Sequence, residues 1–257
     1  MKHIFLIALC CMLSFSCSEN NDDKLGSNNQ NVTPTFVFSQ HWDDTTITNA
    51  DIENTSYTNA NGEVLTITRL RYLLSGFQLL DNNGNPISFQ GYNLVELSNA
   101  ETMTFTPSGS VTPGEYTLRF VFGFDEANNI DGAYTDLNTA SWNWPEMLGG
   151  GYHFLQLDGQ YNVNTTAPLP FNYHNGTAMV SEGEFEQNHT VFNFTESITI
   201  AEGTTIEIKF NVAELFKNPN LWDLNVYNTS LMPNYDAQKL MQQNIASAFT
   251  LGSISQQ

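Results

Sequence analysis

Apolar and polar residues alternate along several short segments of this chain, a pattern typical of β-strands with one buried face. The clearest segment is 116–124, where Tyr116, Leu118, Phe120, Phe122 and Phe124 share one side. Segment 205–210 repeats the alternation, and the first strand is expected around residues 36–38. Turn residues such as Pro113-Gly114 separate these segments. The pattern predicts an all-β fold, either a sandwich or a barrel.

In one long segment, 65–74, the apolar residues change from odd-numbered to even-numbered positions partway along. Leu65 and Ile67 share one parity, whereas Leu70, Tyr72 and Leu74 have the other. Because side chains alternate strictly between the faces of a strand, a shift of one residue predicts a β-bulge or bend near Arg69.

Two short helices are expected toward the C-terminus. Segment 211–217 begins with Asn211 as an N-cap and has Glu214 three residues later. Segment 236–249 places Leu240, Met241, Ile245 and Phe249 along one helical face. Neither an internal repeat nor an interior linker is visible in the sequence, so we expect one domain over residues 34–257.

The N-terminal residues have the features of a bacterial lipoprotein signal. Residues 1–17 consist of a basic start, an apolar run too short to span a membrane, and a small residue before Cys17. Cys17 is therefore the predicted lipidation site, and ordinary signal-peptidase cleavage nearby is the alternative. Residues 18–33 are polar and acidic and predict a flexible tether.

The acidic start of this tether resembles the surface-export signal of lipoproteins in Bacteroidetes-type bacteria. The resemblance implies a lipid anchor in the outer membrane of the cell envelope, facing the periplasm or the cell surface. If Cys17 carries the lipid, Cys10 and Cys11 leave with the signal and no disulfide is expected.

The charge narrows the range of partners. The chain has 27 acidic against 8 basic residues, a formal net charge of −19. This charge argues against nucleic acid and against an anionic lipid surface as partners. We therefore expect contact with the membrane through the lipid anchor only.

The segment 142–154 is rich in groups that suit a soft or borderline metal ion such as copper. It holds Trp142, Trp144, Met147 and His153, together with three consecutive glycines at 149–151 that permit an unusual turn. A second histidine, His174, follows in the segment 171–176.

A hairpin would bring these two histidines together. If segments 153–158 and 171–174 pair as antiparallel strands, one simple register sets His153 directly opposite His174, about 4.5–5.5 Å apart at Cβ. A slip of one residue would put them on opposite faces. The alternative is a hairpin with two unrelated histidines, one hydrogen-bonded and one in solvent.

The remaining polar candidates are less specific. His41 follows the first predicted strand and is a loop histidine by default, and His189 is expected on the surface. The segment 125–132, with Asp125 and Asp131, is rich in oxygen ligands and predicts either a calcium site or a solvated turn. The sequence has no nucleophile elbow, no zinc-protease motif and no phosphate-binding loop, so we expect no enzymatic activity.

Several of these segments together resemble the methanobactin-associated copper-binding (MbnP-like) family, whose members are often lipoproteins in Bacteroidetes. The resemblance extends over most of the mature chain and rests on the order and spacing of the following motifs: Phe38-x-x-His41, Tyr57 to Gly62, Thr68 to Ser75, Gly114-Glu115-Tyr116, Phe122-Gly123-Phe124-Asp125-x-x-Asn128, Trp142-x-Trp144, Gly151-Tyr152-His153-Phe154-x-x-Leu157-Asp158-Gly159 and Phe171-x-x-His174.

The resemblance implies an immunoglobulin-like β-sandwich that binds copper through histidines. In relatives, a nearby tryptophan can be oxidised to kynurenine by a partner dihaem protein of the cytochrome c peroxidase type. His41 and His174 match the recurring histidines, and Trp142 or Trp144 matches the oxidisable tryptophan. This chain departs from the pattern by inserting residues 145–150 and by carrying His153, which puts kynurenine formation in question.

Two functions from different classes follow. The first is a copper-binding lipoprotein for acquisition or storage, with His41, His153 and His174 as ligands, Met147 as a weak soft ligand, and Trp144 next to the centre. The second is a surface adhesion or glycan-binding module in which Trp142, Trp144 and Tyr152 form a stacking platform.

Overall fold

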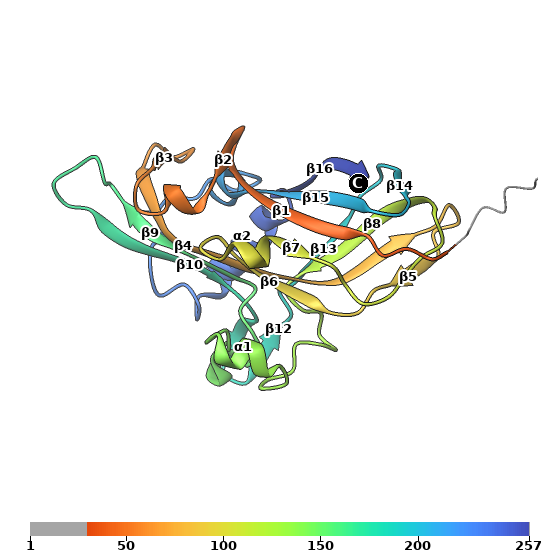
Figure 1. The fold of residues 1–257 in the computed structure, drawn as a ribbon. Helices are drawn as coiled ribbons and strands as arrows, with labels where there is room; N and C mark the ends of the chain where they lie inside the picture. Colours follow the sequence, from red (N-terminus) through yellow and green to blue (C-terminus); the bar gives the residue numbers. More distant parts are fainter. Residues whose placement is uncertain (1–29, 257) are drawn as a thin grey trace, which may run out of the picture.

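Two β-sheets face each other across an aromatic core in residues 30–256, the part of the chain that this computed structural model describes (Figure 1). The predicted signal segment 1–17 with Cys17, and residues 18–29 of the predicted tether, lie outside the described residues. Val32 already forms an antiparallel bridge with Val111. The chain therefore joins the fold two residues before the predicted domain boundary at residue 34.

The smaller sheet contains the first and last strands of the domain. Its order is β2 (Thr45–Ile47), β1 (Thr35–Trp42), β15 (Thr204–Asn211) and β16 (Phe249–Gln256), and β7 (Thr104–Phe105) also pairs with β1. β1 and β15 run parallel, whereas β15 and β16 run antiparallel. The strands predicted around residues 36–38 and 205–210 are confirmed as β1 and β15.

The larger sheet carries the candidate site. Its main order is β10 (Leu169–Asn175), β9 (Leu155–Tyr161), β4 (Val64–Leu80), β8 (Gly114–Phe122) and β13 (Thr190–Asn193). β14 (Ile198–Ile200) also pairs with β8, and β4 additionally pairs with β3 (Ser56–Thr58), β5 (Pro86–Ser88) and β6 (Tyr92–Glu96). A separate hairpin consists of β11 (Ala178–Ser181) and β12 (Glu184–Glu186). The two facing sheets confirm the predicted all-β sandwich.

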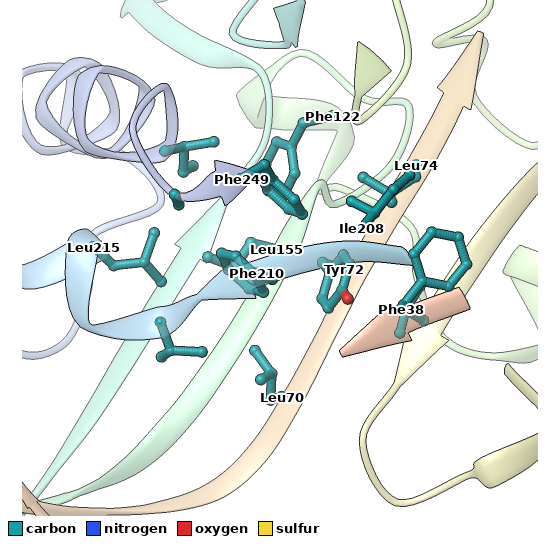
Figure 2. Packing of buried hydrophobic residues seen from close by; sticks show 14 of the residues in the cluster. Phe38, Leu70, Tyr72, Leu74, Phe122, Leu155, Ile208, Phe210, Leu215 and Phe249 are labelled. Carbon is teal, nitrogen blue, oxygen red and sulfur yellow. The ribbon is translucent and has the colours of Figure 1, made fainter. Parts of the chain in front are cut away.

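The space between the sheets is filled by side chains that alternate along the strands. Ile206, Ile208 and Phe210 of β15 are fully buried, as the sequence pattern predicts. Phe210 meets the edge of Tyr72 from the opposite sheet, with ring centroids 4.8 Å apart (Figure 2). It also stacks on Phe249 of β16 at 4.6 Å. Such aromatic pairs add to the free energy gained by burying their surface.

The predicted irregularity in β4 is confirmed. The pairing of β4 with β9 shifts register between Ile67 and Arg69, where the sequence changes parity. The shift sets Arg69 opposite Asp158 of β9. This bulge matters for the candidate site because it places a guanidinium group on the carboxylate of Asp158.

The helices are shorter than the sequence predicts. The segment 211–217 forms a 3₁₀ helix, Val212–Phe216, whose N-cap Asn211 accepts a hydrogen bond from the Ala213 amide. The segment 236–249 forms α2 (Tyr235–Ile245), and the chain then turns so that Phe249 begins β16 instead of ending the helix. The sequence pattern missed these other short helices: α1 (Thr135–Thr139) and the 3₁₀ turns Asn49–Asp51, Ala100–Met103 and Glu146–Leu148. Within residues 30–256, no helix combines the length and the apolar character needed to cross a membrane.

A glycine in β9 packs against β4 with no room for a side chain. A Cβ atom added to Gly159 would lie 2.0 Å from the carbonyl oxygen of Thr66 and 2.6 Å from the Phe171 ring. A backbone oxygen in a paired strand cannot move aside cheaply. We therefore expect Gly159→Ala to lower the free energy of unfolding by about 3 kcal/mol, measured by urea denaturation.

The matched control is Gly114→Ala in β8. A Cβ atom there meets the Tyr116 ring at 3.4 Å, an ordinary contact, so its unfolding midpoint should stay near that of the wild type. Equal stability of the two variants would contradict the close packing of β9 against β4.

Candidate metal centre

The predicted hairpin exists, but its predicted register is wrong. β9 and β10 pair antiparallel, and His174 faces Gln156 rather than His153. β9 begins only at Leu155, so His153 precedes the strand. The physical reason is that the chain before β9 is held by a loop: the amide of His153 donates to the carbonyl of Trp142 at 2.9 Å, and the amide of Phe154 donates to that of Asn175 at 2.7 Å.

The three glycines form the turn that the sequence predicts. Gly149, Gly150 and Gly151 all have φ between 63° and 107°, in the left-handed region that other residues avoid. Two of them also lack room for a side chain, because an added Cβ would lie 2.6 Å from Thr177 or 2.4 Å from Asn129. This turn returns the chain from Trp144 to His153.

The loop brings the two histidines together despite the different register. The ring centroids of His153 and His174 lie 5.4 Å apart with nearly perpendicular planes. His153 is buried, with 6% of its surface exposed, whereas His174 is partly exposed. His153 precedes β9 and His174 is near the last residue of β10, so the pair lies at the end of the β9–β10 hairpin away from its connecting loop. In Figure 1 this end of the hairpin lies on the side toward α1.

Each histidine is anchored through one ring nitrogen. Nδ1 of His153 lies 3.1 Å from the carbonyl oxygen of Trp142, and Nε2 of His174 lies 2.8 Å from Oδ1 of Asp158. A carbonyl and a carboxylate can only accept, so both anchoring nitrogens carry the proton. Among the described residues, neither Nε2 of His153 nor Nδ1 of His174 has a hydrogen-bond partner. This is the arrangement by which proteins orient metal-binding imidazoles.

Asp158 is the hub of these contacts. Its Oδ1 also accepts a hydrogen bond from Asn172 at 2.6 Å, and its Oδ2 pairs with Nε of Arg69 at 2.5 Å. Burial opposes ionisation of this carboxyl group, but His174, Asn172 and Arg69 more than offset it and hold its pKa well below the usual range. Asp158 belongs to one of the motifs by which the sequence resembles the MbnP-like family, but no spacing rule in the sequence identified its role.

His153 is in its neutral form at neutral pH. Burial is the main cause, and the charge interactions with His174, Arg71 and Arg69 add to it, lowering the pKa of His153 to about 3. A neutral imidazole has the free lone pair that a metal ion requires.

Both tryptophans are inside the protein. Trp142 and Trp144 are 0% and 1% exposed. Trp144 meets the His153 ring edge-on at 4.9 Å and donates its indole N–H to the carbonyl of Leu148. Trp142 belongs to a small second core with Tyr152, and the guanidinium of Arg71 lies 5.0 Å above its ring. The two rings thus form a buried wall behind His153.

Met147 lies on the solvent side of the centre. Its side chain is 79% exposed, and it lines a cavity of about 450 Å³ together with His174. Met232 lines the same cavity. Sequence reasoning missed Met232, which is 58 residues beyond His174 and belongs to no recognisable motif.

The other predicted histidines lie elsewhere. His41 is on β1 of the smaller sheet, where its Nε2 lies 3.0 Å from the hydroxyl of Ser39. It lines a different cavity, of about 710 Å³, with Asp43 and Lys209. His189 was expected on the surface, but it is half-buried, because it packs beside α2 where Gln242 hydrogen-bonds to its carbonyl.

The acidic segment after β8 has structural roles in the described chain. Asp125 accepts hydrogen bonds from the amide and side chain of Asn128, and Asp131 accepts one from the amide of Gly151. Across residues 30–256, no group of three or more His, Cys, Asp and Glu side chains is arranged to hold a metal ion. A centre at His153 and His174 therefore depends on two imidazoles and on donors other than carboxylates or thiolates.

Two comparisons agree with this architecture. The solved structure of MbnP from Methylosinus trichosporium superposes with a TM-score of 0.55 over 87% of this chain and 99% of that chain, at 12% sequence identity, which shows a shared fold. No curated protein matches the sequence significantly. The family model for MbnP matches residues 29–233, well over half of the chain, and the protein therefore belongs to the MbnP family.

Proposed function

We propose that this protein binds copper for acquisition or storage, through a centre built on His153 and His174. The observation that carries the proposal is the anchored histidine pair: two rings 5.4 Å apart, each with one nitrogen held by a hydrogen bond and the other free. Membership of the MbnP family supports a copper-associated role in general.

The donor set fits copper better than a hard cation. Imidazole nitrogens suit copper, zinc, iron and nickel, and a thioether such as that of Met147 favours copper(I) among them. The nearest carboxylate, Asp158, is occupied by Arg69, Asn172 and His174. Met147 would therefore act as a weak soft ligand beside the two imidazoles.

His41 takes no part in the proposed centre. It lies on the other sheet, and its ring contacts Ser39, which in turn donates to Glu207. The three-histidine site expected from the sequence is thus reduced to a pair, and His41 becomes a suitable control.

The proposal places the protein in the cell envelope as a lipoprotein anchored through Cys17 to the outer membrane. It also includes Trp144 as the tryptophan open to oxidation, with a dihaem cytochrome c peroxidase-like protein as partner. Trp144 is preferred over Trp142 because its ring is nearer to that of His153. Peptide mapping of native protein by mass spectrometry tests the lipid and the tryptophan together.

The geometry weighs against the glycan-binding alternative. A sugar-stacking platform needs exposed aromatic faces, but Trp142, Trp144 and Tyr152 are all at most 1% exposed. These three rings belong to the interior, and they offer no surface on which a sugar could stack.

Loss of either central histidine should remove copper binding. We expect the purified wild-type domain to take up one equivalent of copper, and His153→Ala and His174→Ala each to lose this uptake. His41→Ala should retain it, because its ring lies outside the centre. Metal content after gel filtration measures the result, and circular dichroism checks that each variant is folded.

The outcomes separate the alternatives. Equal, weak uptake by the wild type and both central variants would refute copper binding at this pair. Loss of uptake in His41→Ala as well would restore the three-histidine site expected from the sequence.

Removing the charge of Asp158 should weaken copper without abolishing its binding. Asp158→Asn keeps an acceptor for His174 but removes the negative charge, which orients the imidazole and raises its basicity as a ligand. We expect affinity to fall by about 10–100-fold with unchanged stoichiometry, measured by competition with a chromophoric chelator. Asp81→Asn is the control, since Asp81 also accepts several hydrogen bonds but lies in an exposed turn. Equal affinities of the two variants would contradict the role of Asp158.

A further inference from the structure

Two methionines line the cavity beside His174, and they come from different segments. Met147 lies on the wall formed by the 3₁₀ turn Glu146–Leu148, and Met232 lies on the wall formed by the segment before α2. His174, at the end of β10, is the third donor residue of the same cavity. Three segments that are far apart in the sequence thus place two thioethers and one imidazole around one space of about 450 Å³.

The remaining lining favours a soft ion. Leu148, Leu231 and two prolines contribute apolar surface, and none of the residues found to line this cavity is Asp or Glu. Calcium and magnesium require oxygen ligands, and among its side chains this lining supplies oxygen only through one amide and one hydroxyl group. Thioethers, in contrast, select copper(I) among the biological first-row ions.

A fully buried side chain of α2 fixes the segment before Met232 relative to the end of β10. Nε2 of Gln238 donates to the carbonyl of His174 at 2.8 Å and to that of Leu231 at 3.2 Å. Oε1 of Gln238 accepts from the side chain of Asn175 and from the amide of Gly176. Gln238 therefore holds the residue before Met232 and the backbone of His174 in one rigid unit, so the cavity is a built feature of the fold.

Met147 differs from the other two donors in its exposure. Its side chain is 79% exposed, and Met232 is half-buried. A flexible, exposed thioether at the rim costs hydrophobic free energy unless it has a partner. Exposure thus falls from Met147 at the rim to Met232 and His174, which are both partly buried, and the ring of His174 contacts the buried His153.

We propose that Met147 and Met232 form a copper(I)-selective entrance, with His174 as the ligand shared between the entrance and the inner histidine pair. The inference rests on the proposed copper-binding function and adds to it an entrance with its own donors, Met147 and Met232. Copper(II), which prefers nitrogen and oxygen donors, would depend on the histidines and much less on the sulfurs.

The test compares the affinities for the two oxidation states. Copper(I) is titrated without oxygen against a chromophoric copper(I) chelator, and copper(II) is titrated separately in air. In Met147→Leu/Met232→Leu, we expect at least about a tenfold loss of copper(I) affinity and an unchanged copper(II) affinity. Leucine preserves the approximate volume of the side chain, so the cavity walls should stay in place. Met179→Leu is the control, since Met179 lies on β11 and does not line the cavity.

A second measurement observes the sulfur atoms directly. Silver(I) serves as a copper(I)-like probe that does not change its oxidation state, and the methyl groups of the methionines are labelled with carbon-13 for NMR. Silver(I) should shift the methyl signals of Met147 and Met232, which are assigned by their absence from the single leucine variants. The Met179 signal should not move.

Each result decides between the proposals. Unchanged copper(I) affinity in the double variant, or unshifted Met147 and Met232 signals, overturns the entrance while leaving the histidine pair intact. A parallel loss of copper(I) and copper(II) affinity overturns the selectivity. If the wild-type protein binds neither ion, the proposed function itself fails.

Discussion

The carboxylate of Asp158 joins three strands at the point where the candidate centre forms. It accepts hydrogen bonds from Arg69 of β4 and from Asn172 and His174 of β10. Asp158 itself belongs to β9, which lies between these two strands. A buried carboxylate without such partners would carry a large desolvation cost, so the hydrogen bonds and the ion pair are a condition of its presence. Removing one of these partners would leave part of the buried Asp158 charge without a hydrogen bond or a counter-ion. The orientation of His174 is therefore tied to the register of the whole larger sheet.

The local features of this arrangement could be predicted from the sequence, because they depend on alternation within single strands. The parity change between Ile67 and Leu70 predicted the bulge, and that bulge is what sets Arg69 opposite Asp158. The buried faces of β8 and β15 followed from the same period of two. The unusual turn at Gly149 to Gly151 could also be predicted locally, because glycine alone adopts these φ values without strain.

The features that depend on contacts between distant segments could not be predicted. The register of β9 with β10 cannot be fixed by counting, because the loop from Trp142 to Phe154 hydrogen-bonds to its own start and to Asn175 before β9 begins. His153 meets His174 through that loop and not through strand pairing. Likewise, Gln238 and Met232 reach the site through the fold of the C-terminal segments, and no periodicity in the chain indicates that. Phe249 fits a helical face in the sequence, but the strand β16 buries it against Phe210, which the helix pattern does not reveal.

The charges around the candidate centre differ from those of the chain as a whole, whose formal net charge is −19. Two of its eight basic residues, Arg69 and Arg71, lie beside the histidines, and both lower the pKa of His153. Within residues 30–256, Asp158 is the only carboxylate found to pair with His174, and its charge is balanced by Arg69. The surface can attract cations over long distances, whereas the donors proposed for the centre are imidazole nitrogens and thioether sulfurs. Such donors discriminate among metal ions by softness and not by charge, so in the proposed centre the selectivity and the general attraction of the surface arise from different residues.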